Sequence, residues 1–436
     1  MIWAKEETLP REEIERIQLT KLKDTVRYIY DRVKPYREKM DMAGVRPEDI
    51  QTLEDLKKLP FTYKADFRDH YPDGLFAVDK KEIVRYHASS GTTGKPTVVG
   101  YTRNDLDIWL NNVARIACMG GATEEDVAQI AFGYGTFTGA LGLHGGLEKI
   151  GASVIPMSSG NTNKQIMFLQ DMGVTLLVAT PSYALHLGEE LRRRGIDPSK
   201  DLKIRIGLFG GEGMTEPMRE EMHRVWGEQF VCTQNCGMSE LCGPGVSGEC
   251  TQLCGMHINE DWFIPEIIDP ETEEVLPPGE RGELVVTCLG KEALPIVRYR
   301  TGDMTRLMYE PCKCGRTTCR MENLSGRADD MLVIRGVNVF PTQIEEVLLK
   351  IDEIGPHYEI LVERKNRLDV MTITVELIDD RLLDSYAKLS ELETRIKSAL
   401  KSQLGLATCI RLVAPNSLRR FEGKAKRVTD LRKDGL

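Results

Sequence analysis

The chain has 436 residues, of which 41% are hydrophobic and 29% charged, as is typical of a globular enzyme with about two to three domains. Its net charge of −9 disfavours a nucleic-acid partner, and we expect neither a signal peptide at Met1–Glu7 nor a membrane span of ~20 apolar residues. The odd number of cysteines, 11, argues against a disulfide framework and predicts a cytoplasmic protein with reduced thiols, some of them available to a metal.

The first 325 residues predict a layered α/β domain. Apolar spacing predicts a helix over 12–32, and Thr52 resembles the start of a second helix that ends before Pro60. Beyond residue 103, helical and strand patterns alternate, which is typical of a largely parallel sheet covered by helices. The predicted helices are 105–119 and 143–150, and the predicted strands are 127–132, 153–156, 174–179, 204–209 and 281–287.

The loops that follow three of these strands are rich in glycine or hydroxyl residues. They cover 133–139, 180–182 and 210–212. Because ligands of parallel sheets bind beyond the carboxyl ends of the strands, we expect these loops to line a binding site.

The last 110 residues or so read as a separate small α+β domain with the order β-α-β-β-α-β. Its predicted elements are a strand at 331–334, a helix at 341–350, a hairpin of 358–362 and 369–376, a helix at 381–403 and a strand at 409–413. The sequence therefore predicts two domains, 1–326 and 327–436, the second acting as a mobile lid.

The stretch Ser89–Thr97 combines glycines, hydroxyls and one lysine, which are the groups that wrap a polyphosphate. A P-loop is excluded, because only two residues separate Gly91 from Gly94 and because Pro96 leads into a strand instead of a helix. We expect a hairpin loop that closes over phosphates; the alternative is an ordinary polar turn.

Two cysteine motifs predict a structural zinc site. Cys250-x3-Cys254-x2-His257 and Cys312-x-Cys314-x4-Cys319 together offer more than the four ligands of a tetrahedral zinc ion. The preferred set is Cys250, His257, Cys312 and Cys314, with Cys254 and Cys319 as alternates. The competing interpretation is a group of reduced thiols in surface loops.

The order of the motifs resembles the adenylate-forming superfamily of acyl-CoA synthetases, peptide-synthetase adenylation domains and luciferases, over nearly the whole chain. Within it, the chain is most similar to the phenylacetate–CoA ligase subfamily. The resemblance is carried by Gly133–Gly139, Val154–Pro156, Cys236–Glu240, Pro265–Pro270, Tyr299–Asp303, Gly326–Asp330 and Gly423-Lys424.

The resemblance implies roles for individual residues. Catalysis falls to Lys424, which stabilises charge on the α-phosphate, and to Glu240, which binds Mg²⁺. ATP and AMP are held by Ser90, Gly91, Thr92, Thr93, Gly94, Lys95, Gly211, Glu212, Asn235, Cys236, Gly237, Met238, Ser239, Asp303 and Arg327. Cys236 stands where the family has an adenine-stacking tyrosine, so the adenine contact is in doubt. The acid pocket is Tyr134, Thr136, Phe137, Gly139 and Ala140, and the hinge and coenzyme A contacts are Asp329, Arg335 and Gly336.

The expected function is ligation of an aryl acid to coenzyme A through an acyl-adenylate, using ATP and Mg²⁺. Phenylacetate is the first expectation, and indoleacetate and other aryl acids stay open. A homodimer is compatible with the sequence. The alternatives are an enzyme that loads an aryl acid onto a carrier protein, and a catalytically silent nucleotide-binding regulator.

Overall fold

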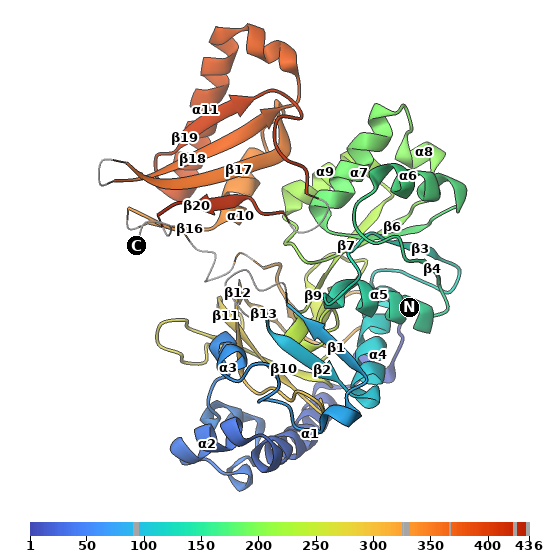
Figure 1. The fold of residues 1–436 in the computed structure, drawn as a ribbon, viewed down its shortest axis with the longest axis vertical. Helices are drawn as coiled ribbons and strands as arrows, with labels where there is room; N and C mark the ends of the chain where they lie inside the picture. Colours follow the sequence, from blue (N-terminus) through green and yellow to red (C-terminus); the bar gives the residue numbers. More distant parts are fainter. Residues whose placement is uncertain are drawn as a thin grey trace. The chain divides into compact units, whose positions relative to one another are not determined.

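The computed structural model describes residues 1–89, 96–324, 326, 332–335, 337–365, 368–421 and 425–432 (Figure 1). Its contacts divide the chain into two compact units. The first unit consists of Met1–Thr180, Ser199–Gly211 and Phe230–Asn323, and the second of Pro181–Pro198, Glu212–Gln229 and Leu324–Leu436.

The first unit begins with helices. The expected helix over 12–32 is α1 (Arg11–Arg32), and its apolar side chains Leu22 and Ile29 are fully buried. The predicted start at Thr52 precedes a 3-10 helix, η3 (Leu53–Lys58). The other early elements are η1 (Lys5–Thr8), α2 (Lys34–Met42), η2 (Pro47–Asp49), α3 (Lys64–Asp69) and η4 (Lys80–Glu82).

A nine-stranded sheet organises the first unit, in the order β13-β14-β9-β8-β7-β6-β5-β3-β4 within the described residues. The strands β4, β3, β5, β6 and β7 are parallel, as expected, and β5 and β6 are buried on both faces. The remaining pairs are antiparallel. The bounds are β3 (Val127–Ile130), β4 (Ser153–Ile155), β5 (Leu176–Ala179), β6 (Ile206–Phe209), β7 (Val231–Cys236), β8 (Ser247–Glu249), β9 (Met256–Ile258), β13 (Leu307–Met308) and β14 (Arg320–Met321).

The parallel strands end side by side. Ile130 pairs with Val178, Ala179 with Phe209, and Phe209 with Gln234. The segments that leave β3, β5, β6 and β7 therefore start from one edge of the sheet, which is where ligands of parallel sheets bind.

Two helices of the first unit, α4 (Arg103–Met119) and α5 (Thr138–Lys149), approach each other closely through glycine. A Cβ atom added at Gly142 would lie 2.6 Å from the ring of the fully buried Trp109, and one at Gly146 would lie 2.5 Å from Val113. The loss of helix propensity at these glycines is offset by close packing. The expected helix over 143–150 starts earlier, at Thr138, so that Gly139 and Ala140 belong to its first turn.

Two smaller sheets complete the first unit. The hairpin of β1 (Arg85–Ala88) and β2 (Val98–Tyr101) is antiparallel, as expected for the strands around the glycine-rich loop. The strands β10 (Phe263–Ile268), β11 (Gly282–Cys288) and β12 (Tyr299–Thr305) form an antiparallel sheet. Further short helices are α6 (Thr162–Asp171), α8 (Pro198–Asp201) and η5 (Ser239–Leu241).

In the second unit, α7 (Pro181–Arg193) packs on α9 (Glu216–Trp226). The Trp226 indole N–H donates to the Ala184 carbonyl oxygen at 3.1 Å. The prediction of a loop at 180–182 was wrong from Pro181 onward, because proline fits the first turn of a helix, where its missing N–H costs nothing.

The rest of the second unit has a four-stranded sheet in the order β19-β18-β17-β20 within the described residues. Figure 1 shows α11 lying against it, and both contribute to a core that contains Ile360, Ile373 and Ile396. The bounds are α10 (Pro341–Leu348), β17 (Ile354–Lys365), β18 (Leu368–Leu377), η6 (Asp380–Asp384), α11 (Tyr386–Leu404), β19 (Cys409–Val413) and β20 (Val428–Asp430).

The structure adds two short strands to those expected for this region and divides one expected helix. The first strand of the predicted β-α-β-β-α-β order, β15 (Leu332–Ile334), pairs with β16 (Val337–Val339), and β20 takes the sheet edge beside β17. The helix expected over 381–403 is split, because Ser385 has an extended backbone between η6 and α11.

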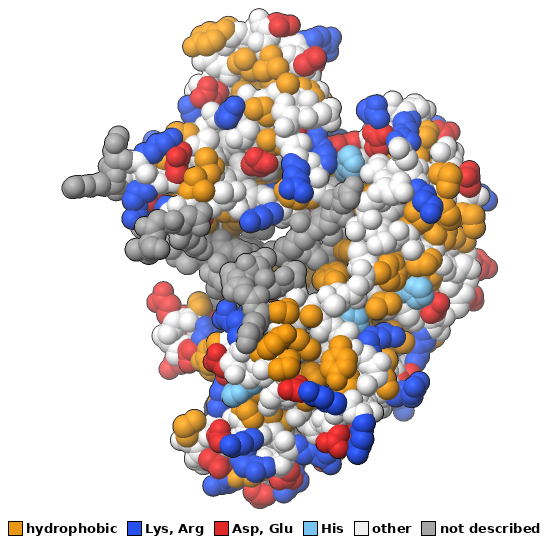
Figure 2. Space-filling model, viewed as in Figure 1, with side chains coloured by type: hydrophobic (Ala, Val, Ile, Leu, Met, Phe, Trp, Pro, Cys, Tyr) orange, Lys and Arg blue, Asp and Glu red, His pale blue; other side chains and the backbone are white. Residues whose placement is uncertain are grey.

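Among the described residues, no helix combines the length and apolarity that crossing a membrane requires. On the face drawn in Figure 2, Lys and Arg side chains are interspersed with Asp and Glu. Among the described residues drawn on that face, the charges are mixed, unlike the continuous basic surface that binds a nucleic-acid backbone.

Candidate functional site

The phosphate-loop candidates Ser90, Gly91, Thr92, Thr93, Gly94 and Lys95 lie outside the described residues. The residues that flank them are paired. The Ser89 amide donates to the Thr97 carbonyl oxygen at 3.0 Å, and the Thr97 amide donates to the Ser89 hydroxyl at 3.0 Å. With the pairing of β1 and β2, these bonds close the base of a hairpin, as the sequence predicts.

The magnesium candidate Glu240 lies in η5, a tight turn after β7. The amides of Leu241 and Gly243 both donate to the Met238 carbonyl oxygen, at 2.9 and 2.8 Å. A Cβ atom at Gly237 would lie 2.6 Å from the Gly243 Cα atom, so this turn requires glycine. Glu240 is 5% exposed, and the Tyr299 hydroxyl donates to its Oε1 at 3.5 Å. This long bond leaves carboxylate lone pairs available to a cation.

The adenine-pocket candidates of β6 and β7 come together. The Asn235 side-chain amide donates to the Phe209 carbonyl oxygen at 2.8 Å. A Cβ atom at Gly210 would lie 2.7 Å from Asn235 Oδ1, which explains the glycine there. Gly211 follows with a φ of +79°, and Cys236 is half-buried at the end of β7. These contacts fix the loop after β6 against the end of β7, where the Glu240 turn begins.

The ribose candidate Asp303 is buried on β12. Its amide donates to the Thr301 hydroxyl at 3.0 Å, and that hydroxyl donates to the Leu284 carbonyl oxygen of β11 at 2.8 Å. The register of β11 and β12 shifts beside Asp303, where Gly302 has a φ of +77°, so the strand is irregular at this place. Tyr299, at the start of the same strand, contacts Glu240.

The acid-pocket candidates follow β3. The Thr136 carbonyl oxygen accepts hydrogen bonds from the Ala88 amide and from His87 Nδ1, both at 2.9 Å. Burial lowers the pKa of His87, so its ring is neutral and donates through Nδ1. This pairing joins the loop to the β1–β2 hairpin.

Aromatic groups give this loop an apolar character. The rings of Phe132 and Phe137 lie 6.1 Å apart, and the Tyr134 hydroxyl lies 2.9 Å from His144 Nδ1. The Thr138 hydroxyl lies 3.3 Å from the Ser239 hydroxyl, so the first turn of α5, with Gly139 and Ala140, reaches the Glu240 turn.

In the second unit, the Glu212 carboxylate accepts hydrogen bonds from the Ser182 amide, the Ser182 hydroxyl and the Ala425 amide. Arg335 donates from Nε to the Asp369 carbonyl oxygen at 2.8 Å. The candidates Arg327, Asp329, Gly336 and Lys424 lie outside the described residues.

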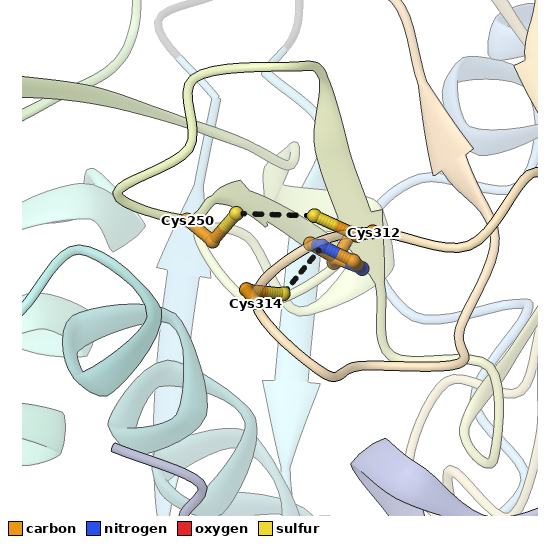
Figure 3. A group of neighbouring side chains, drawn as sticks. Cys250, Cys312 and Cys314 are labelled. Atoms are coloured by element: carbon orange, nitrogen blue, oxygen red, sulfur yellow. Dashed lines mark hydrogen bonds between the residues drawn. The ribbon is translucent and has the colours of Figure 1, made fainter.

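The structure brings the preferred zinc set together. The ligand atoms of Cys250, His257, Cys312 and Cys314 all lie within 4.8 Å of one another (Figure 3). Cys250 follows β8, His257 lies in β9, and the two other cysteines lie in the turn before β14, which pairs with β9. Cys254 is exposed and its sulfur lies 3.5 Å from that of Cys312, but it does not belong to the group whose ligand atoms are all mutually close, and neither does the buried Cys319.

The distances in this cluster suit a tetrahedral zinc ion. Two sulfur ligands of one zinc lie roughly 3.8 Å apart when each Zn–S bond is ~2.3 Å. The Cys250 and Cys312 sulfurs are 3.7 Å apart, and the Cys314 sulfur is 3.3 Å from His257 Nε2.

The histidine of the cluster is prepared for metal binding. Burial and the nearby Arg316 lower the pKa of His257 to about 4, so its ring is neutral near pH 7. Its Nδ1–H faces the Thr318 hydroxyl at 3.1 Å, which leaves the Nε2 lone pair for the cluster. Burial raises the pKa of the Cys250 thiol, so a thiolate there requires a cation.

The family models match both parts of the chain. The AMP-binding enzyme model matches residues 9–288, and the model of the AMP-binding enzyme C-terminal domain matches residues 336–432. The chain belongs to the AMP-binding enzyme family. The sequence resemblance to adenylate-forming enzymes is thereby confirmed.

Curated members of the family share nearly the full length of this one. The phenylacetate-coenzyme A ligase of Thermus thermophilus is 48% identical over 441 residues, which cover 98% of this chain and 98% of that protein. The phenylacetate-coenzyme A ligase of Escherichia coli is 46% identical, with coverage of 98% and 97%. The predicted similarity to this subfamily is also confirmed.

A solved member of the family has the same fold. The 2-hydroxyisobutyryl-CoA ligase in its postadenylation state aligns with a TM-score of 0.92 at 28% identity, over 99% of this chain and 92% of that one. The same ligase with coenzyme A in its thioesterification state aligns with a TM-score of 0.72, over 98% and 93%. The predicted α/β architecture with a small C-terminal domain is confirmed.

Sequence reasoning missed several residues that contact the candidate site. Tyr101, Thr138 and Lys291 all contact the Glu240 turn, yet none was assigned a role. The sequence did carry a signal for Lys291, because a charged residue stands between two mostly apolar segments, Leu284–Leu289 and Ala293–Val297. Both segments are buried in the structure.

Proposed function

We propose that this protein is an ATP-dependent ligase that joins an aryl acid, with phenylacetate as the first candidate, to coenzyme A. In the first step, the acid carboxylate attacks the α-phosphate of ATP, which forms the acyl-adenylate and releases pyrophosphate. In the second step, the coenzyme A thiol attacks the acyl carbon, which forms the thioester and releases AMP. The observation that carries this proposal is 48% identity to a phenylacetate-coenzyme A ligase over 98% of both chains.

The proposed site residues bind different parts of the ATP–magnesium complex. We propose that Glu240 would hold Mg²⁺, because a hard cation prefers carboxylate oxygen, and the ion would neutralise phosphate charge. Asp303 would accept both ribose hydroxyls, and Lys424 would stabilise the α-phosphate in the first step. The phosphates would be bound by residues 90–95, and the nucleotide further by Gly211, Glu212, Asn235, Cys236, Gly237, Met238, Ser239 and Arg327.

Substrate recognition falls to the loop after β3. Aromatic Tyr134 and Phe137 beside small Gly139 and Ala140 suit a flat aryl ring. Thr136 lies between them, with its carbonyl oxygen fixed by His87 and Ala88. The contact between Thr138 and Ser239 supports a position of the acid next to the Glu240 turn.

The two steps require two arrangements of the chain. We propose that residues 1–326 bind ATP and the acid, and that residues 327–436 rotate about Asp329 between the steps. Arg335 and Gly336 would then face the pantetheine arm of coenzyme A. The related 2-hydroxyisobutyryl-CoA ligase supports this scheme, because it has been solved in both a postadenylation and a thioesterification state.

A panel of carboxylic acids tests the function. AMP release would be measured for phenylacetate, indoleacetate, benzoate and aliphatic acids, each with and without free coenzyme A. We expect phenylacetate to give the highest kcat/KM and thioester only when coenzyme A is present. Adenylate formation without thioester would favour the carrier-loading alternative. Absence of pyrophosphate release with every acid would favour the silent regulator and reject the proposal.

We also propose a cytoplasmic location, where ATP and coenzyme A are supplied.

We further propose that Cys250, His257, Cys312 and Cys314 hold a structural zinc ion. All four ligands would be protein atoms, which leaves no open position for catalysis. The ion would join the segment after β8 to the turn before β14, and so stabilise the antiparallel half of the large sheet.

Loss of one ligand should remove the metal and destabilise the first unit. We expect the purified protein to contain stoichiometric zinc, and the Cys312→Ser variant to lose it together with several degrees of thermal stability. Elemental analysis and a thermal melt measure both effects. The matched control is Cys409→Ser, because Cys409 is an exposed thiol in β19. Equal zinc content in the two variants would contradict the proposed set.

A further inference from the structure

We propose that Lys291 is a positioning residue for the magnesium site, acting through the backbone of the turn that carries Glu240. This inference rests on the proposed role of Glu240. The feature that prompts it is a lysine that is only 5% exposed and that belongs to none of the family motifs identified in the sequence.

The Lys291 ammonium group contacts the turn directly. Its Nζ donates to the Glu240 carbonyl oxygen at 2.9 Å. The Tyr101 hydroxyl donates to the carbonyl oxygen of the preceding residue, Ser239, at 3.2 Å. Two side chains thus hold two consecutive carbonyl groups, one on each side of the Glu240 amide and Cα atoms.

The two donors also support each other. Lys291 Nζ lies 5.0 Å from the centre of the Tyr101 ring, within the range of a cation–π contact. The Tyr101 ring stacks on Trp109 at 5.0 Å and is fully buried. The ammonium group therefore has a rigid apolar wall on one side and the turn on the other.

The backbone that carries Lys291 is itself fixed to the start of α4. The buried Asp105 carboxylate accepts hydrogen bonds from the amides of Glu292 and Ala293, at 2.7 and 2.9 Å. The Glu292 carboxylate accepts from the Thr102 hydroxyl at 2.7 Å. The backbone next to Lys291 is thus fixed to the N-terminal end of α4. The Lys291 ammonium group can therefore hold the Glu240 carbonyl group in a fixed position.

Burying an ammonium group raises the free energy of the folded state unless the group is paired. A lysine at this place is therefore expected to have a function that offsets this cost. A charged donor binds a carbonyl oxygen more strongly than a neutral one does. Magnesium demands near-ideal ligand geometry, and partners that orient a metal ligand typically contribute about 10- to 100-fold in metal affinity. Fixing the Glu240 backbone is such a role.

The chain offers a matched control in Lys21. Its Nζ also donates to a backbone carbonyl oxygen, that of Asp261 at 2.7 Å, and it also lies over an aromatic ring, 3.2 Å from the centre of Trp262. Lys21 has the same kinds of contact without touching the Glu240 turn. Lys21 is half-buried and Lys291 is buried, so the control is matched in its contacts. Any effect that comes only from losing a lysine that binds a backbone carbonyl oxygen and an aromatic ring should appear in both variants.

The experiment compares Lys291→Met, Lys291→Arg, Tyr101→Phe and Lys21→Met with the wild type and with Glu240→Gln. For each protein, the Mg²⁺ concentration that gives half-maximal pyrophosphate release is measured at saturating ATP, together with thermal stability. We expect Lys291→Met to raise that concentration about 10- to 100-fold. Lys291→Arg should recover part of the loss, Tyr101→Phe should give a smaller rise, and Lys21→Met should leave the Mg²⁺ requirement unchanged.

Two outcomes distinguish a failure of the Lys291 inference from a failure of the proposed magnesium site. An unchanged Mg²⁺ requirement in Lys291→Met, with a raised one in Glu240→Gln, would reject the positioning role and keep the magnesium site. An unchanged requirement in Glu240→Gln would reject the magnesium site itself. If Lys291→Met does not fold, Tyr101→Phe decides, because it removes one hydroxyl and keeps the ring; an unchanged Mg²⁺ requirement there would reject the inference.

Discussion

The Lys424→Ala variant is expected to lose acyl-adenylate formation by about 10²–10³-fold, the usual effect of removing one group that stabilises charge in a transition state. It should still convert a supplied acyl-adenylate and coenzyme A to thioester at close to the wild-type rate, because the proposed lysine contact belongs to the first step alone. The measurements are ATP–pyrophosphate exchange for the first step and thioester formation from synthetic phenylacetyl-adenylate for the second.

The control for this variant is Lys426→Ala. Lys426 lies two residues away in the same basic segment, and its side chain is exposed. We expect both steps to survive in Lys426→Ala. Pyrophosphate exchange that persists in Lys424→Ala would show that the residue has another role. Loss of both steps, with an unchanged thermal melt, would place the lysine in the thioester step as well.

The second large effect is expected for Glu240→Gln. The substitution keeps the shape of the side chain, and the amide oxygen can still accept the Tyr299 hydrogen bond, but the charge that attracts Mg²⁺ is lost. We expect the Mg²⁺ requirement for pyrophosphate release to rise by at least about 10²-fold, more than the loss of an outer partner causes. A titration of Mg²⁺ at saturating ATP measures this directly.

Glu266→Gln is the matching control. Glu266 is also a buried glutamate, and its carboxylate forms an ion pair with Arg298 at 3.0 Å. Breaking a buried ion pair destabilises the fold, so this variant should melt at a lower temperature with a normal Mg²⁺ requirement. A similar rise in the Mg²⁺ requirement in both variants would mean that the effect is structural and that Glu240 has no special role.

The sequence alone predicted most of the features that depend on local patterns. Apolar runs that alternate with helical patterns predicted β3, β4, β5 and β6. The signal is strongest for β5 and β6, which are buried on both faces and therefore need continuous apolar residues. Cysteine spacing predicted the four residues of the Cys/His cluster, whose ligand atoms lie within 4.8 Å of one another, because closely spaced thiols and a nearby histidine are typical of a zinc site. Family motifs identified the Glu240 turn.

Only the tertiary structure decided the features that depend on distant partners. The contact between Lys291 and the Glu240 carbonyl oxygen joins residues 51 positions apart, and a backbone acceptor is common to every residue type, so no local pattern reveals it. The close approach of α5 to α4 depends on the fit of Gly142 against Trp109 and of Gly146 against Val113, and these partners are distant in the sequence. Likewise β20, a strand that the sequence did not predict, lies beside β17, because strand partners are selected by which edges meet in space.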